Sequence, residues 1–170
     1  MWRRWPARFD ALACCIGAAV PDVVDGVIGL ARGNLGQSYG HGLAGLIAIC
    51  WPVGIALHLL AKAVARRTRW ASRLTGRGTR PGVEAWSVLA GALSHLVFDF
   101  VSHGNFLWLY PWYVDEHFFP SWWYARWLEI PLPFYREPYP LGPHLLVWIA
   151  LSALGIVLFF TRVGAPRAGR

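Results

Sequence analysis

Charged residues are scarce in this sequence of 170 residues. Only 15% are Asp, Glu, Lys or Arg, whereas 56% are hydrophobic and the mean hydropathy is +0.39. A soluble domain ordinarily carries about 25% charged residues, so this composition argues against an ordinary soluble domain. The simplest organisation is a single integral membrane domain over residues 1–170.

Cysteine is also scarce. The three cysteines, Cys14, Cys15 and Cys50, lie in apolar runs without the spacing of a metal site. Small buried thiols are therefore expected in place of a disulfide framework. The net charge of +7 would suggest nucleic-acid binding in a soluble protein. Here the arginines lie between apolar segments, so membrane topology explains them better and no nucleic-acid partner is expected.

Four apolar segments are each close to the ~20 residues that a helix needs to cross a bilayer. The sequence predicts an all-α membrane protein with about four transmembrane helices, which has the lipid bilayer as its main partner. The oligomeric state stays open. The predicted spans run roughly over residues 11–31, 43–65, 83–103 and 143–161.

The basic residues orient these spans. They precede the first span, fill the arginine-rich loop 66–82 and its flanks, and follow the fourth span, so that 13 of the 16 fall on one side. The positive-inside rule therefore predicts cytoplasmic N and C termini in a bacterial inner (plasma) membrane. A secretory signal peptide ending near Ala18 is the rival interpretation of the N-terminus, but the apolar residues 27–31 suit a continuing span better.

The external connection 104–142 between the third and fourth spans is rich in tryptophan, tyrosine and proline. Aromatic side chains of this kind gather where a membrane meets water. We expect an interfacial belt on the outer leaflet, and a lid over a site at the outer helix ends is a compatible alternative.

Three ionisable residues follow one face of the third span, since His95, Asp99 and His103 have i, i+4, i+8 spacing. Such groups are costly inside a bilayer and usually mark a functional site. A rise of ~1.5 Å per residue separates His95 from His103 by ~12 Å, so both cannot bind one ion. His95 with Asp99, or Asp99 with His103, could each supply two ligands. The first pair is favoured, and a helix-fastening hydrogen bond is its structural alternative.

Other polar residues fall in the same outer half of the predicted bilayer. Asp22 and Asp25 interrupt the first span on one face, and His41 lies at the outer mouth of the second span. With His95 and Asp99 they are predicted to bind a divalent metal, Zn²⁺ first, with Mn²⁺ or Fe²⁺ as alternatives. Asp22 could instead cap a half-helix after Pro21, and His41 could be an interfacial group.

The remaining candidates carry weaker predictions. Arg32 is nearly alone on the external side, where it could bind an anionic substrate or lipid headgroups. His58 lies towards the cytoplasmic end of its span and is expected to be structural. His117 and His144 are expected to be exposed residues of the aromatic belt.

Several short motifs occur in a defined order over residues 17–111. In that order they resemble the small integral-membrane proteins classed as membrane-bound metal-dependent hydrolases (the YdjM-like proteins). The resemblance implies a metal-dependent hydrolase without naming a substrate. The motifs that carry it are Pro21-Asp22-Val-Val-Asp25, Arg32-Gly33, Ser38-Tyr-Gly-His41, Ser94-His95-Leu-Val-Phe-Asp99 and Tyr110-Pro111.

Two classes of function follow from these residues. The first is a membrane-embedded metal-dependent hydrolase in which Asp25 or Asp99 could serve as a general base and His103 as an acid–base group. Its substrate is expected to be a lipid or lipid-linked molecule, because the site would open near the outer leaflet. The second is a non-enzymatic protein, either an ion- or proton-coupled transporter subunit or an assembly factor.

Overall fold

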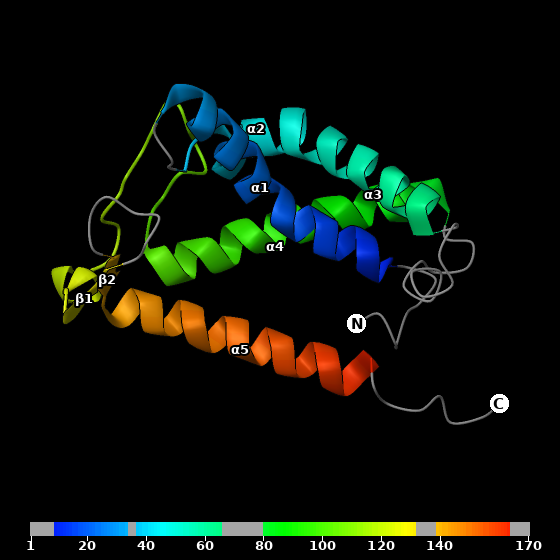
Figure 1. The fold of residues 1–170 in the computed structure, drawn as a ribbon. Helices are drawn as coiled ribbons and strands as arrows, with labels where there is room; N and C mark the ends of the chain where they lie inside the picture. The colour runs from blue at the N-terminus through cyan, green and yellow to red at the C-terminus, as the bar shows by residue number, and fades with distance from the viewer. Residues whose placement is uncertain (1–8, 34–36, 66–79, 132–138, 164–170) are drawn as a thin grey trace. The chain divides into compact units, whose positions relative to one another are not determined.

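The computed structural model describes residues 9–33, 37–65, 80–131 and 139–163 (Figure 1). It confirms the predicted all-α fold. The second span combines three consecutive helical segments, α2, the π-helical turn η2 and α3. In chain order, the helices and helical turns are α1 (Ala11–Arg32), η1 (Tyr39–His41), α2 (Leu43–Gly45), η2 (Leu46–Cys50), α3 (Trp51–Ala65), α4 (Pro81–His103), η4 (Ser121–Tyr124) and α5 (Pro143–Val163).

Three helices are long and apolar enough to cross a bilayer, which indicates an integral membrane protein. They are Ala11–Arg32, Leu43–Ala65 and Pro81–His103, and the apolar part of α5 over Pro143–Val157 is shorter. The full helices, with α5 ending at Val163, begin and end within two residues of the predicted spans. Most of the predicted loop 66–82 lies outside the described residues, so the cytoplasmic position of the termini stays a prediction.

The chain divides into two compact units. The first unit contains residues 1–98 and 106–115, and the second contains residues 99–105 and 116–170. Helix α4 contributes to both, since the boundary falls after Phe98. The single membrane domain stays a prediction, and each unit is described by itself below.

Helix α1 begins and ends at recognisable caps. The Asp10 carboxylate accepts a hydrogen bond from the Ala13 N–H at 2.9 Å, which satisfies one of the free amides of the first turn. The helix ends at Gly33, whose φ of 69° is the left-handed conformation that glycine adopts without strain. Between these caps the helix continues through Pro21, which transmembrane helices tolerate.

The core of the first unit lies where α1, the second span and α4 meet. Trp51 Nε1 donates to the Ala85 carbonyl at 2.8 Å and so ties the second span to α4. The packed side chains are small or medium-sized, which allows the helices to approach closely. The buried cluster contains Val20, Val24, Leu46, Cys50, Ala92 and Leu96.

Glycine permits the contact between α1 and α4. A Cβ atom at Gly17 would overlap the Val88 carbonyl, and one at Gly91 would overlap the Cys14 carbonyl. Both overlaps involve backbone of the facing helix, which cannot rotate away as a side chain can. The α1–α4 crossing therefore requires these two glycines.

Replacing Gly17 with valine is expected to destabilise the protein by about 3 kcal/mol, because the added side chain forces α1 away from α4. Gly26→Val is the matched control, since Gly26 lies on the same helix with nothing within 4 Å of an added Cβ. Thermal unfolding in detergent measures both. Equal effects of the two substitutions would show that helix propensity, and not the crossing, sets the cost.

A short segment of the connection between α4 and α5 packs on the start of the second span. Phe106 and Asp115 pair through two backbone hydrogen bonds of 2.6 and 3.1 Å, which close this segment into a loop. Within it, the Trp108 carbonyl accepts from the Leu43 N–H at 2.8 Å. The Tyr110 ring packs edge-on against Tyr39 at 5.1 Å. The loop therefore helps to hold η1 in place.

The rest of the connection between α4 and α5 lies in the second unit, with its remaining aromatic residues. Tyr124 donates its hydroxyl hydrogen to the Gly104 carbonyl at 2.9 Å and accepts from the Phe119 N–H at 2.9 Å. Two short antiparallel strands follow, β1 (Leu128–Ile130) and β2 (Tyr139–Leu141), which the sequence did not predict. The side chains of Trp122 and Trp127 are exposed, as an interfacial belt requires.

Candidate metal site

Three predicted site residues come together in the first unit. Asp22 lies on α1, His41 on η1 and His95 on α4, and one ligand atom of each lies within 4.8 Å of the others. Asp22 Oδ1 is 3.4 Å from His41 Nε2 and 3.5 Å from His95 Nε2. The two Nε2 atoms are 3.2 Å apart. These atoms form a nearly equilateral triangle.

The triangle fits a metal ion in both size and chemistry. Ligands held about 2.0–2.1 Å from a tetrahedral zinc ion are about 3.3–3.4 Å apart. An octahedral ion at the same bond length would bring neighbouring ligands to about 2.9 Å. The two contacts with Asp22 are also longer than the usual range of a hydrogen bond. Two imidazoles and a carboxylate are a common donor set for Zn²⁺ and for Fe²⁺.

Asp25 orients one of the three ligands. It lies one turn after Asp22, is 3% exposed, and accepts from His41 Nδ1 at 2.7 Å. It also accepts from the Ser38 N–H at 2.6 Å, the Ser38 hydroxyl at 2.8 Å and the Gly40 N–H at 2.7 Å. A carboxylate that accepts from Nδ1 favours the His41 tautomer in which Nε2 carries the lone pair.

This pairing is the arrangement that metal-binding histidines use. A ligand imidazole ordinarily donates its second N–H to a carboxylate or a carbonyl, which fixes the ring and its tautomer. The sequence predicted Asp25 as a ligand or a base. Its four hydrogen bonds instead favour a positioning role for this residue.

The local fold explains why η1 can lie directly against α1. A Cβ atom at Gly40 would overlap the Pro21 carbonyl and lie 3.0 Å from the Asp25 carboxyl group. Glycine at this position therefore lets the η1 backbone approach the acidic pair. The π-helical turn Leu46–Cys50 follows after α2, and such turns are frequent near functional sites.

The triangle is open on one side of the first unit. The Asp22 side chain is 68% exposed and that of His95 16%, whereas that of His41 is 3% exposed. Catalytic zinc sites keep one coordination position for water or substrate, whereas structural sites are closed. The exposure gradient places such an open position on the side of Asp22.

Asp99 and His103 form a separate pair in the second unit. His103 Nε2 is 3.1 Å from Asp99 Oδ1, and the two side chains are 25% and 15% exposed. The sequence favoured His95 with Asp99 as a ligand pair, whereas in the structure the His95 ring lies against Asp22 and His41. The ligand role of Asp99 and the acid–base role of His103 stay predictions.

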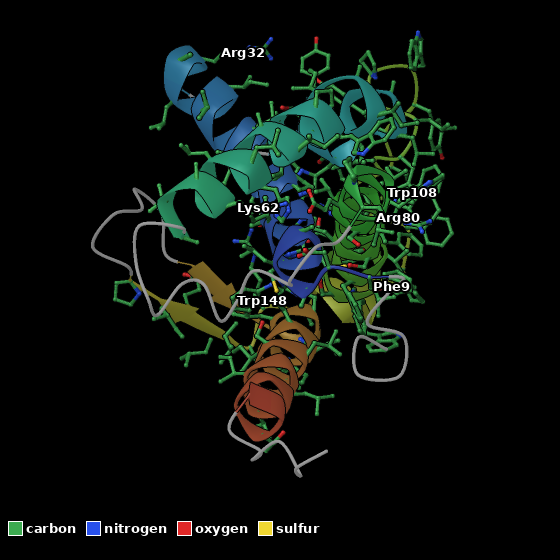
Figure 2. The ribbon with its side chains drawn as sticks, turned by 90° about the vertical axis from the view of Figure 1, so that its right-hand side faces the viewer. Phe9, Arg32, Lys62, Arg80, Trp108 and Trp148 are labelled. Atoms are coloured by element: carbon green, nitrogen blue, oxygen red, sulfur yellow. The ribbon has the colours of Figure 1, made fainter. Side chains whose placement is uncertain are left out.

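Arg32 closes α1 at the end opposite to Phe9 (Figure 2). Its guanidinium carbon lies 5.5 Å from the centre of the Tyr39 ring, within the range of a cation–π contact. Tyr39 opens the η1 turn that carries His41. The substrate role predicted for Arg32 stays a prediction.

A second group of ligand-type residues was missed at the sequence level. Asp10, His58 and Glu84 are all buried, and one ligand atom of each lies within 4.8 Å of the others. Lys62 Nζ binds Glu84 Oε1 at 2.5 Å. The sequence did carry one signal for this group. Successive spans cross in opposite directions, so the starts of the first and third spans lie near the end of the second (Figure 1).

Comparison of the chain with protein-family models, curated proteins and solved structures finds no match. The fold and the two groups define a class, namely a multi-span helical membrane protein with His, Asp and Glu side chains placed to hold metal ions. The hydrolase activity that the resemblance implies stays a prediction.

Proposed function

We propose that this chain is a metal-dependent hydrolase of the bacterial plasma membrane, with its site in the outer half of the bilayer. The single observation that carries the proposal is the triangle of Asp22, His41 and His95, whose edges measure 3.2–3.5 Å. The order of motifs along residues 17–111, which resembles that of membrane-bound hydrolases, supports the same class.

The roles of the residues follow from their contacts. Asp22, His41 and His95 would hold a divalent metal, with Zn²⁺ as the first candidate for two imidazoles and a carboxylate. When bound, the metal would activate a water molecule and polarise the scissile bond. Asp25 holds the Nδ1 proton of His41, so that Nε2 remains a ligand atom. The exposed side of Asp22 leaves room for water and substrate.

The acid–base role that the sequence suggested for Asp25, Asp99 or His103 stays a prediction. Asp25 is less suited to this role, because four donors already occupy its oxygens. In the second unit, His103 Nε2 lies 3.1 Å from Asp99 Oδ1.

A lipid or lipid-linked substrate suits the surface around the triangle. On α1, Val23 and Val27 are 48% and 63% exposed, and on α4, Val97 and Phe98 are 49% and 54% exposed. Apolar side chains next to Asp22 and His95 favour contact with acyl chains. A polar, water-soluble substrate would gain nothing from these contacts.

The non-enzymatic alternative needs a polar path along the helices. Glu84 and His95 are ~16 Å apart along α4, from ~1.5 Å of rise per residue. The buried residues between these levels include Val20, Val88 and Ala92, all at most 1% exposed. This apolar packing separates the two polar groups, so the observations favour a hydrolase over an ion relay.

Hydrolysis is tested with the full chain purified in detergent and loaded with Zn²⁺. The protein is incubated with a bacterial membrane lipid extract, and the products are analysed by mass spectrometry. We expect loss of an ester or phosphoester lipid, abolished by a chelator and by His41→Ala. Proton or ion flux in proteoliposomes without any lipid hydrolysis would favour the transporter class and contradict this proposal.

A further inference from the structure

We propose that Asp10, His58 and Glu84 form a second divalent-metal site, distinct from the triangle of Asp22, His41 and His95. The ion that fits this site is a transition metal that accepts nitrogen and oxygen donors, such as Zn²⁺ or Co²⁺. The inference uses residues that the proposed hydrolytic function does not.

The three side chains come from three parts of the first unit. Asp10 precedes α1, His58 lies on α3 and Glu84 lies in the first turn of α4. They are 2%, 1% and 6% exposed, so the group is enclosed. An ion bound here would bridge three helices, as structural metal sites do.

The two ring nitrogens of His58 are the evidence for a bound ion. Among the described residues, neither its Nδ1 nor its Nε2 has a hydrogen-bond partner, although both atoms are buried. Buried polar atoms are nearly always satisfied, so an orphaned imidazole needs an explanation. Its Nε2 lies 3.6 Å from Glu84 Oε2, too far for a hydrogen bond and near the about 3.3–3.4 Å between tetrahedral ligands.

The two carboxylates are already held in place. Asp10 caps α1 through Oδ1, and its backbone N–H donates to the Ser87 hydroxyl at 2.8 Å. Glu84 uses Oε1 for the Lys62 ammonium, which leaves Oε2 on the side of His58. The ion pair with Lys62 therefore orients Glu84 through Oε1, and Oε2 faces the imidazole.

The ion pair between Lys62 and Glu84 does not account for the imidazole. It uses Glu84 Oε1, whereas neither ring nitrogen of His58 has a hydrogen-bond partner among the described residues.

Metal stoichiometry of the full-length protein tests the proposal. The purified chain is equilibrated with Zn²⁺ alone, freed of excess metal, and analysed for zinc per chain. We expect two equivalents in the wild type and one in Glu84→Gln or His58→Asn. In His95→Ala we expect one equivalent, and in the double variant with His58→Asn none. Lys62→Met, which removes the ion pair but no ligand, is the control and should keep two.

The outcomes separate this site from the triangle. If only the second site exists, the wild type binds one equivalent that is lost in His58→Asn and kept in His95→Ala. If the wild type binds one equivalent or none and His58→Asn changes nothing, the second site is refuted. Loss of zinc in Lys62→Met together with Glu84→Gln would show that binding follows the ion pair, which also contradicts the proposal.

A spectroscopic measurement keeps the test valid if a variant does not fold. Wild-type protein titrated with Co²⁺ should develop visible absorption that saturates in two steps, one for each site. In His95→Ala the titration should keep a single step, and the absence of any visible absorption in this variant would overturn the proposal.

Discussion

Replacing His95 with alanine is expected to weaken zinc binding at the triangle by at least about a hundred-fold and to abolish hydrolysis. The triangle has three protein ligands, and even the loss of a residue that only orients a ligand commonly costs 10- to 100-fold in affinity. Zinc titration with a competing chelator measures the affinity. Lipid turnover under saturating zinc measures the activity.

Ser94→Ala is the control for this prediction. Ser94 precedes His95 on α4, and its hydroxyl donates to the Gly91 carbonyl of its own helix at 2.7 Å. Its removal leaves the three ligands in place, so zinc affinity should remain within a factor of about three of the wild type. A similar loss in both variants would mean that the α4 helix, and not the imidazole, controls binding.

Replacing Asp25 with asparagine is expected to cost both stability and metal binding. The amide replaces one acceptor oxygen with a donor, so at least one N–H or O–H that now reaches Asp25 loses its acceptor. Losing charge-assisted hydrogen bonds in a buried position should destabilise the protein by about 3 kcal/mol. Zinc affinity should fall about 10- to 100-fold, since His41 loses its orienting partner.

Asp22→Asn separates the two effects of Asp25→Asn. The Asp22 side chain is 68% exposed, whereas that of Asp25 is 4% exposed. Asp22→Asn should therefore remove a ligand while leaving the unfolding temperature in detergent nearly unchanged. Thermal unfolding in the presence of chelator measures stability alone. If Asp25→Asn leaves stability unchanged as well, the hydrogen-bond network around Asp25 does not fasten η1 to α1.

The positions of the spans could be predicted because length and hydropathy alone determine them. Each predicted span agrees with a helix to within two residues. The antiparallel strands Leu128–Ile130 and Tyr139–Leu141 could not be predicted, because three-residue strands carry no measurable periodicity.

The sequence placed Asp22, His41 and His95 at a common depth in the predicted bilayer but left open whether they meet. Depth does not determine direction around a helix axis. The favoured pairing of His95 with Asp99 rested on helical spacing, whereas the structure gives His103 as the neighbour of Asp99. The contacts of His95 come instead from α1 and η1, at distances that only tertiary packing can set.

The positioning role that we propose for Asp25 could not be inferred from the sequence. Asp22 and Asp25 have the same charge and share one helix face, so spacing alone made both of them candidate ligands. One difference arises at η1, where Gly40 brings its backbone N–H within reach of Asp25. A turn between two spans therefore distinguishes the residue that would bind metal from the one that orients a ligand.

X-ray absorption at the zinc edge tests the central claim most directly. The protein carries Glu84→Gln, so that the triangle of Asp22, His41 and His95 is the zinc site under study. The account predicts zinc bound by nitrogen and oxygen at about 2.0–2.1 Å, with two imidazoles that fall to one in His95→Ala. A zinc shell with sulfur ligands, or an imidazole number that His95→Ala leaves unchanged, would contradict it.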